Sequence, residues 1–324
     1  MTCHGALAIG KLLRLPNVFT VVGNVTMAYL FVHQGLSPWW GYLCLLAASM
    51  LMYMAGMALN DVFDVEVDAR ERPQRPIPSG AIRLADATRI GWGLLLAGWL
   101  CGVLAGWLPG NASGMPWRSG LLATLLAGAI VLYDGVLKQT SAGPAVMGVC
   151  RFLNVLLGMS TGGYLATLST WQPIGYSADQ WMIAGGIGVY VMGITWFSRG
   201  EAGESDPRNL ATGISLMLLG FVMLSEFPKL GAFAEGASEL TRGEPWLWTL
   251  IIAMLAFTIV WVCYVALGDP TAKQVQLAVK QSILSLIVID AAIVMATCTH
   301  FVWTLVVLML LLPAMFLGRL MYST

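Results

Sequence analysis

Long stretches of the sequence carry no charged side chain, and this feature most restricts the fold. From Leu15 to Asn60 the chain contains no Lys, Arg, Asp or Glu. A helix needs about 20 apolar residues to cross the hydrocarbon core of a bilayer, so this stretch holds two spans, with a turn near Gly35 and Pro38. Only 10% of the sequence is charged and 58% is hydrophobic, whereas soluble domains carry about 25% charged residues. A soluble enzyme is therefore excluded.

Further charge-free runs follow along the rest of the chain. The last stretch, residues 281–320, is apolar apart from Asp290 and Arg319 and would form a helix about 60 Å long, twice the hydrocarbon thickness, so we expect it to turn back at Thr299–His300. The sequence then predicts ten spans in a single membrane domain, residues 1–324. The runs are residues 15–60, 90–117, 119–133, 152–178 (with its helix beginning near Pro144), 180–198, 209–225, 245–268 and 281–320.

The positive charges gather on one side of the predicted bundle. Ten spans place both termini on the same side, and cytoplasmic loops carry an excess of Lys and Arg, so both termini are predicted to be cytoplasmic. The formal net charge is zero, which does not suggest a nucleic-acid partner. The terminal side would hold Lys11, Arg14, Arg70, Arg72, Arg75, Arg83, Arg89, Lys138, Arg199, Arg208, Lys273, Lys280 and Arg319, and the other side Arg118, Lys229 and Arg242.

An acidic cluster follows the second predicted span. Residues 60–68 read Asn-Asp-Val-Phe-Asp-Val-Glu-Val-Asp, so Asp61, Asp64 and Asp68 share one face of a helix, with Asn60 beside Asp64. Stacked like charges destabilise a helix by a few tenths of a kcal/mol per pair, unless a cation lies among them. Mg²⁺ prefers oxygen ligands, typically one or two carboxylates together with phosphate oxygens. We therefore expect these four residues to hold Mg²⁺; a solvated acidic helix end is the alternative.

Basic residues follow the acidic cluster at once. Arg72 and Arg75 lie in the segment Arg-Glu-Arg-Pro-Gln-Arg-Pro-Ile-Pro-Ser-Gly, in which prolines stiffen the chain and arginines offer forked donors to phosphate oxygens. Carboxylates beside guanidinium groups suit a metal diphosphate. Anchoring of the span at the cytoplasmic face is the alternative for these arginines.

The motif NDxxDxxxD at the end of the second span, followed by an RPxRPxPSG segment, resembles the UbiA family of intramembrane prenyltransferases. The likeness continues in the segment Tyr133–Lys138, which closes the fourth span as the family's YxxxxK-type element does, and in a Gly-rich fifth span with Asn154. It implies an all-α, polytopic membrane helix bundle. Nine spans match the family's plan, and a tenth, at about residues 300–320, is additional.

The resemblance also implies an activity. A prenyl diphosphate bound through Mg²⁺ would lose its diphosphate in a lipid-accessible cavity, and the prenyl group would alkylate an aromatic or other lipophilic acceptor. Metal and basic side chains stabilise the leaving diphosphate, and a water-poor cavity protects the carbocation. Arg151 and Asn154 are i,i+3 neighbours and would extend the phosphate-binding wall from Lys138. Helix packing through hydrogen bonds is the alternative for Asn154.

The chain departs from the family pattern after the sixth span, where the family has a second Asp-rich motif that holds a second metal. Residues 195–206 read Thr-Trp-Phe-Ser-Arg-Gly-Glu-Ala-Gly-Glu-Ser-Asp, and the TWFSRGEA part resembles that of EboC-like relatives, a divergent branch. One interpretation is a working transferase in which Arg199 replaces a metal ion and Glu201 or Asp206 completes an altered site. The other is an inactive protein that binds or transports an isoprenoid or another lipid-like metabolite.

A carrier or channel is the remaining class. It predicts repeated halves and a charged site at the midplane, whereas the charged clusters of this chain gather at one face, which favours an enzyme. The predicted catalytic residues are Asp61, Asp64, Asp68, Lys138, Arg199 and Glu201. The predicted diphosphate-binding residues are Asn60, Arg72, Arg75, Lys138, Arg151, Asn154 and Arg199, and the predicted metal ligands are Asn60, Asp61, Asp64, Asp68 and Asp206.

Overall fold

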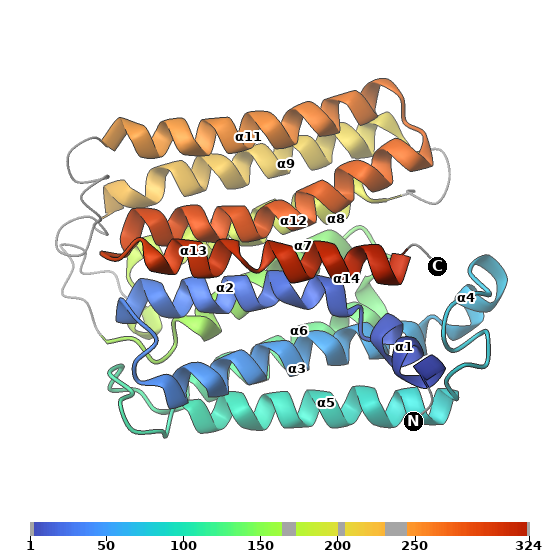
Figure 1. Ribbon diagram of the computed structural model, residues 1–324, viewed down its shortest axis with the longest axis horizontal. Coiled ribbons are helices and arrows are strands. Elements are labelled where there is room, and N and C mark those ends of the chain that lie inside the picture. Colours follow the sequence, from blue (N-terminus) through green and yellow to red (C-terminus); the bar gives the residue numbers. More distant parts are fainter. Residues whose placement is uncertain (1–2, 164–172, 200–204, 231–244, 323–324) are drawn as a thin grey trace.

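The part of the chain that the structure describes is built of helices and the turns between them. The computed structural model describes residues 3–163, 173–199, 205–230 and 245–322, and its long helices run roughly along one axis (Figure 1). This confirms the predicted all-α class. The elements are α1 (Cys3–Leu12), α2 (Leu15–His33), α3 (Trp39–Phe63), α4 (Val65–Glu71), α5 (Leu84–Ala105), α6 (Trp117–Leu132), the π-helical turn η1 (Tyr133–Leu137), α7 (Gly143–Gly158), η2 (Pro173–Gly175), α8 (Ala178–Phe197), α9 (Pro207–Glu226), η3 (Phe227–Leu230), α11 (Pro245–Gly268), α12 (Ala272–Thr297), α13 (Val302–Leu308) and α14 (Leu311–Tyr322).

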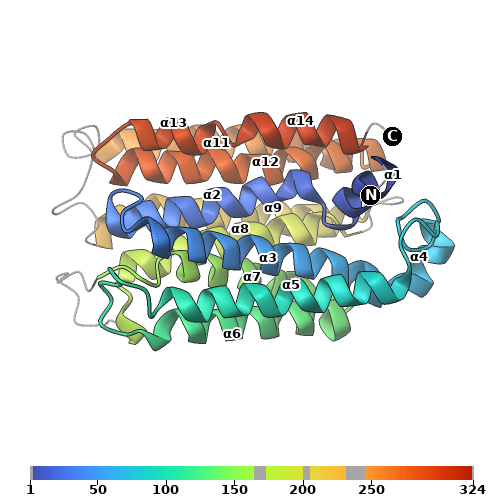
Figure 2. The same cartoon turned by 60° about the horizontal axis from the view of Figure 1, so that its bottom comes forward.

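Eight helical segments within these ranges are long and apolar enough to cross a membrane. They are α2, α3, α5, α6 with η1, α9 with η3, most of α11, α12, and α13 with α14. The helices α7 and α8 run among them (Figure 2). Large apolar side chains such as Leu96, Phe257 and Phe316 are exposed on the outside, where lipid rather than water suits them. The count of ten spans stays a prediction.

The helix α2 lies at the centre of the bundle. It packs against α3, α7, α12 and α14, and every residue from Gly23 to Phe31 is buried. The chain enters α2 through Arg14, whose backbone is left-handed (φ 46°), and Pro16 lies in the first turn, where a missing N–H leaves no hydrogen bond unmade. The side chain of Arg14 is thereby placed at the end of the bundle, near the end of α3.

Glycines bring α7, α8 and α9 into close contact. A Cβ atom on Gly213 of α9 would lie 2.6 Å from the Cβ atom of Phe197 and 2.8 Å from the carbonyl oxygen of Gly193, both on α8. On the other side of α8, a Cβ atom on Gly148 of α7 would lie 2.7 Å from the carbonyl oxygen of Gly188. Only small residues allow helices to approach this closely. The contacts hold the last turn of α8 in place beside its neighbours.

We expect Gly213→Val to lower the free energy of unfolding by about 1–3 kcal/mol, because the added side chain forces α8 and α9 apart. Gly128→Val is the matched control, since Gly128 is also helical and nothing lies within 4 Å of its Cβ position. Thermal unfolding in detergent, followed by circular dichroism, measures both. Equal midpoints for the two variants would contradict the close packing described for α8 and α9.

The structure differs from the sequence prediction at the end of α7 and within the last apolar stretch. The helix α7 ends at Gly158, although the charge-free run continues to Ala178. A charge-free run indicates an apolar environment and does not show where a helix ends. The last run turns back between Thr297 and Val302, as predicted. It is then divided into α13 and α14, because Pro313 has no N–H to donate to the carbonyl four residues earlier.

Candidate functional site

The acidic cluster lies at the end of the bundle that also carries α1, α4 and the last turn of α14 (Figure 1). The prediction that one continuous helix presents all three aspartates was wrong. The helix α3 ends at Phe63, and α4 begins at Val65 after Asp64, whose ψ of 6° departs from helical geometry. The carboxylates form two groups, Asp61 with Asp68 and Asp64 alone, and each group meets a different cation.

Arg75 joins the first and third aspartates. Its Nη1 atom donates to Oδ1 of Asp61 at 3.1 Å and to Oδ2 of Asp68 at 2.5 Å. The side chains of both aspartates are only 5% exposed, so this pairing lies largely out of water. Nη2 of Arg14 lies 3.6 Å from the same oxygen of Asp61. The loop after α4 therefore folds back and returns Arg75 to the carboxylates that precede it in the sequence.

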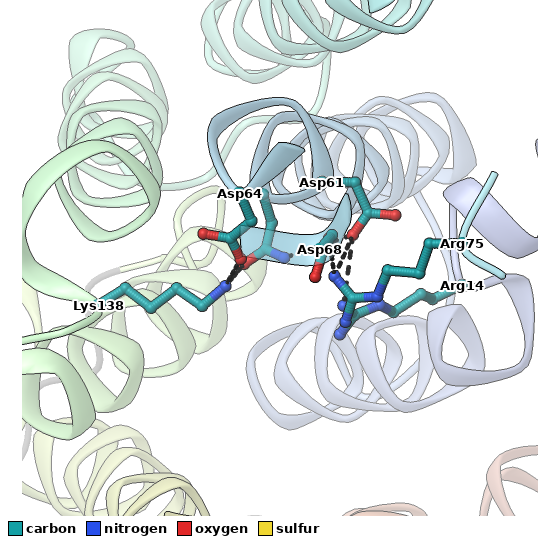
Figure 3. A network of polar contacts seen from close by, with 7 residues as sticks. Arg14, Asp61, Asp64, Asp68, Arg75 and Lys138 are labelled. Atoms are coloured by element: carbon teal, nitrogen blue, oxygen red, sulfur yellow. Dashed lines mark hydrogen bonds and ion pairs between the residues drawn. The ribbon is translucent and has the colours of Figure 1, made fainter. Parts of the chain in front are cut away.

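Lys138 joins the other pair from the opposite side (Figure 3). Its Nζ atom donates to Oδ1 of Asn60 at 2.7 Å and to a carboxylate oxygen of Asp64. Lys138 directly follows η1, where its own N–H bonds to the carbonyl of Tyr133 at 2.9 Å, five residues earlier. Such π-turns are rare and frequently lie at functional sites. This pairing places Lys138 beside the acidic motif, although the two are far apart in the sequence. We call the cluster of Asn60, Asp61, Asp64, Asp68, Arg75 and Lys138 the mouth.

The donors at this mouth suit Mg²⁺ by their chemistry, since an amide and three carboxylates offer only oxygen ligands. Among the described residues, no three acidic, His or Cys side chains converge closely enough to hold an ion. The reason is visible in Figure 3: Asp61 and Asp68 turn toward Arg75 and Arg14, and Asp64 turns toward Lys138. The residues present therefore fit magnesium by their chemistry, while in this structure their carboxylates are paired with Arg75, Arg14 and Lys138.

A largely apolar cavity lies directly beneath the mouth. It lies between α2, α3, α6 with η1, and α7, is partly open to its surroundings, and has a volume of about 80 Å³. Gly56 and Met57 line it one turn below Asn60, and Met52, Leu126 and Ile130 supply much of the apolar wall. Its polar groups come from Ser49, Tyr53, Tyr133, Asp134, Arg151 and Asn154. A charged mouth above an apolar chamber matches a ligand with a charged head and an oily tail.

Arg151 and Asn154 both line this cavity, on one face of α7 as predicted. That Arg151 extends a phosphate-binding wall from Lys138 stays a prediction; in the structure α2 holds its guanidinium group. Nη1 donates to Oδ1 of Asn24 at 2.8 Å, and Nδ2 of Asn24 donates to both carboxylate oxygens of Asp290, at 2.7 and 2.8 Å. Asn154 accepts a hydrogen bond from Ser49 at 2.5 Å. Asn154 thus also has the helix-linking contact that was its alternative, and Arg151 likewise links α7 to α2.

The segment after α8 is arranged differently from the acidic cluster. Arg199 donates to the carbonyl oxygen of Thr140, two residues after Lys138, and its guanidinium carbon lies 4.8 Å from the centre of the Trp196 ring. The structure does not bring Asp206 to the other carboxylates: it is exposed and caps α9 by accepting the N–H of Arg208 at 2.9 Å. Glu201 lies outside the described residues.

Three further charged side chains lie near the mouth, and sequence reasoning named only one of them, Arg72, as a site residue. Arg72 ends α4 and makes no ion pair within the part of the chain that the structure describes. Sequence reasoning missed Arg14, because a cation before the first span was interpreted only as a sign of orientation. It also missed Asp134 of the cavity wall. A carboxylate inside an apolar run, four residues before Lys138, was the available signal.

The fold and the site define a class of membrane helix bundle with a charged mouth over an apolar chamber, and comparison with known proteins gives the family. The model of the UbiA prenyltransferase family matches residues 20–210, which is more than half of the chain. The chain belongs to this family and is a multi-pass integral membrane protein. The placement in an EboC-like branch stays a prediction.

The chain spans less than half the length of several curated relatives that it matches. It is 34% identical over 131 residues to a digeranylgeranylglyceryl phosphate synthase of Metallosphaera sedula, which is 39% of this chain and 42% of that protein. It is 29% identical over 154 residues to a 4-hydroxybenzoate octaprenyltransferase of Paracidovorax citrulli, covering 46% of this chain and 49% of that protein.

Solved structures share the fold over most of the chain. A structure of digeranylgeranylglyceryl phosphate synthase has a TM-score of 0.60 at 18% identity, covering 90% of this chain and 98% of that one. A UbiA homologue from Archaeoglobus fulgidus, solved with DMAPP and Mg²⁺ bound, has a TM-score of 0.51 at 11% identity, covering 87% and 99%. At these identities the likeness establishes the fold alone.

Proposed function

We propose that the protein transfers an isoprenyl group from a prenyl diphosphate to a lipophilic acceptor within the membrane, with Mg²⁺ as cofactor. The observation that carries this proposal is the position of the mixed acidic and basic mouth directly above the apolar cavity. Each CH₂ group of a prenyl tail favours apolar surroundings by about 0.8 kcal/mol, so the tail belongs in the chamber and the diphosphate at the mouth. The excess of cations near this end favours a cytoplasmic orientation of the site.

The residues at the mouth would divide the work of binding the diphosphate. Asn60, Asp61, Asp64 and Asp68 would hold Mg²⁺, which neutralises negative charge on the diphosphate when bound. Arg75 and Lys138, together with Arg72, would donate hydrogen bonds to its oxygens as the allylic C–O bond breaks and the electron pair leaves with the diphosphate.

Aromatic side chains line the cavity below. The rings of Tyr53 and Tyr133 would face the positive prenyl carbon. The apolar wall around them would exclude water, which would otherwise react with the carbocation. Family membership supports this assignment, as does the naming of curated relatives as prenyltransferases. The Archaeoglobus fulgidus homologue with DMAPP and Mg²⁺ supports the choice of ligand class.

The test of this proposal uses the purified full chain in lipid nanodiscs. We expect geranyl, farnesyl and geranylgeranyl diphosphates to bind more tightly with Mg²⁺ than with a chelator, and pyrophosphate to be released when a pool of phenolic and alcoholic acceptors is added. Calorimetry measures the first and a coupled phosphate assay the second. Equal affinity for all three diphosphates with Mg²⁺ and with chelator would refute the proposal.

The second candidate function is binding or transport of an isoprenoid without catalysis. It is favoured by the segment after α8, where Arg199 contacts a backbone carbonyl and Asp206 caps a helix, so that no second acidic group faces the first in the described residues. The same experiment separates the two candidates. Mg²⁺-dependent binding without any pyrophosphate release over many hours would favour the second.

Arg199→Asp tests whether this arginine takes the place of a metal ion. We expect the variant to bind more Mg²⁺ per protein in the presence of prenyl diphosphate, because a fixed cation is exchanged for an oxygen ligand. Arg208→Asp, in an exposed position nearby, is the control and is expected to leave the stoichiometry unchanged. Metal analysis of the isolated complexes measures it. Equal stoichiometry in wild type and Arg199→Asp would leave Arg199 as an anchor of α8 only.

A further inference from the structure

Two polar atoms of the cavity wall have no hydrogen-bond partner among the residues that the structure describes. They are the Oδ2 atom of Asp134, on η1, and the Nδ2 atom of Asn154, on α7. Both residues are more than nine-tenths buried, with exposures of 8% and 5%. An unpartnered polar atom in an apolar setting costs about 1–3 kcal/mol, so native proteins rarely keep two in one chamber without a ligand to satisfy them.

The two atoms have complementary hydrogen-bonding character. A carboxylate oxygen accepts a hydrogen bond, and an amide nitrogen donates one. A hydroxyl group can form a hydrogen bond with either atom, because it donates one hydrogen bond and accepts others. The two polar atoms of the cavity wall therefore suit a ligand that carries an O–H group. The prenyl tail has no polar atom and cannot form a hydrogen bond with either of them.

Asp134 differs from the other carboxylates at this end of the molecule. Asp61, Asp64 and Asp68 are paired with cations at the mouth. Asp290 accepts two hydrogen bonds from Asn24 deeper in the bundle. Asp134 lies between these sets, four residues before Lys138, and its Oδ2 atom lies 3.9 Å from the position that a Cβ atom on Gly56 would take.

We propose that Asp134 is a catalytic residue that binds the hydroxyl group of the acceptor and takes up the proton released during prenyl transfer. The inference rests on the proposed prenyl transfer. In the step, the C–O bond to the diphosphate breaks and its electron pair leaves with pyrophosphate. The acceptor forms the new bond to the prenyl carbon, and the O–H proton passes to the Asp134 carboxylate. One pyrophosphate and one protonated carboxyl group balance each product.

The first arm of the test measures recognition of the hydroxyl group without Mg²⁺ or diphosphate. The probes are 2-naphthol and 2-methoxynaphthalene, which share a ring system but differ in the O–H donor. We expect wild type in nanodiscs to bind 2-naphthol roughly tenfold more tightly, the effect of one hydrogen bond to a charged group. In Asp134→Leu the ratio of the two affinities is expected to fall to about one. A ratio of one in wild type would overturn the proposal.

The second arm measures transfer of the prenyl group to 2-naphthol. Asp134→Asn retains an oxygen that can accept a hydrogen bond but cannot act as a base, so we expect transfer to slow roughly 100-fold or more while affinity for 2-naphthol changes little. Asp134→Ala is expected to regain part of its rate in added formate, which a purely structural role of Asp134 would not produce. Full activity of Asp134→Asn would overturn the proposal.

Asp179→Asn is the matched control. Asp179 is likewise buried and has an Oδ2 atom without a partner, but it lies in the first turn of α8 and does not line the cavity. We expect it to leave both the affinity ratio and the transfer rate unchanged. Affinity of the prenyl diphosphates, measured in parallel for every variant, separates the two hypotheses. If the affinity for prenyl diphosphates does not depend on Mg²⁺, prenyl transfer is refuted, and with it the catalytic role of Asp134. The ratio of the affinities for the two naphthalene probes reports on the hydroxyl site independently of that result.

Discussion

Asp61→Asn is expected to lower the rate of prenyl transfer roughly 100-fold or more and to weaken Mg²⁺-dependent binding of prenyl diphosphates. The substitution keeps the shape of the side chain but removes one negative charge from a mouth in which Asp61 is only 5% exposed. Charge interactions in such a desolvated site are strong, and losing a single group that stabilises the transition state costs 10²–10³ in rate as an order of magnitude. Steady-state kinetics and calorimetry measure the two effects.

Glu66→Gln is the matched control for this prediction. It removes the same charge from the same acidic segment, but Glu66 is exposed on α4 and has no ion pair within the described residues. We expect its kinetics to stay within about twofold of wild type, since exposed charges are screened by water and salt. Similar losses in both variants would mean that only the overall charge of this end matters, and not the position of Asp61.

Arg118→Met is expected to reduce the free energy of unfolding by about 3 kcal/mol or more. Arg118 is 2% exposed and lies near the end of the bundle opposite the acidic cluster. Its guanidinium group donates to the carbonyl oxygens of Ser160, Gly162 and Gly175 at 2.8, 2.7 and 2.9 Å. Methionine fills similar space but leaves three carbonyl groups without their donor, each at a cost of about 1–3 kcal/mol. Thermal unfolding in detergent measures the loss.

Arg83→Met is the control for the stability measurement. The side chain of Arg83 is 82% exposed and pairs only with Asp86 among the described residues, in an i,i+3 contact. Exposed ion pairs contribute little to stability because water and salt screen them, so we expect an unfolding midpoint close to that of wild type. A wild-type midpoint for Arg118→Met as well would show that water replaces the guanidinium group at the three carbonyls.

The sequence predicted the parts of the molecule that local patterns determine. Charge-free runs located the long helices, because a bilayer excludes charge. The spacing of Asp61, Asp64 and Asp68 located the mouth, and the structure does gather these residues with Arg75 and Lys138. The break of α3 at Asp64 was not foreseeable, since the spacing of the aspartates fits one continuous helix.

Contacts between distant segments account for the rest. Lys138 lies 74 residues from Asp64 in sequence, and Arg151 lies 127 residues from Asn24. Such pairings are set by how the helices pack, and no single segment encodes them. For the same reason the charge count placed Arg118 only on the side opposite the termini and did not reveal that it joins the start of α6 to η2 and to the segment after α7. A single Lys or Arg beside an apolar run can mark the orientation of a span or donate to buried carbonyl groups, and only its neighbours in the fold distinguish the two.

The pairing of the mouth carboxylates with Arg75 and Lys138 has a thermodynamic consequence. A free divalent ion must compete with ammonium and guanidinium groups that are tethered at high effective concentration, and a free diphosphate meets those groups while they are neutralised by carboxylates. When metal and diphosphate bind together, Arg75 and Lys138 can pair with the diphosphate while the carboxylates pair with the metal. Every charged group then keeps a partner of opposite charge. Metal and diphosphate are thus expected to enhance each other's affinity by the same factor, as reciprocal coupling requires.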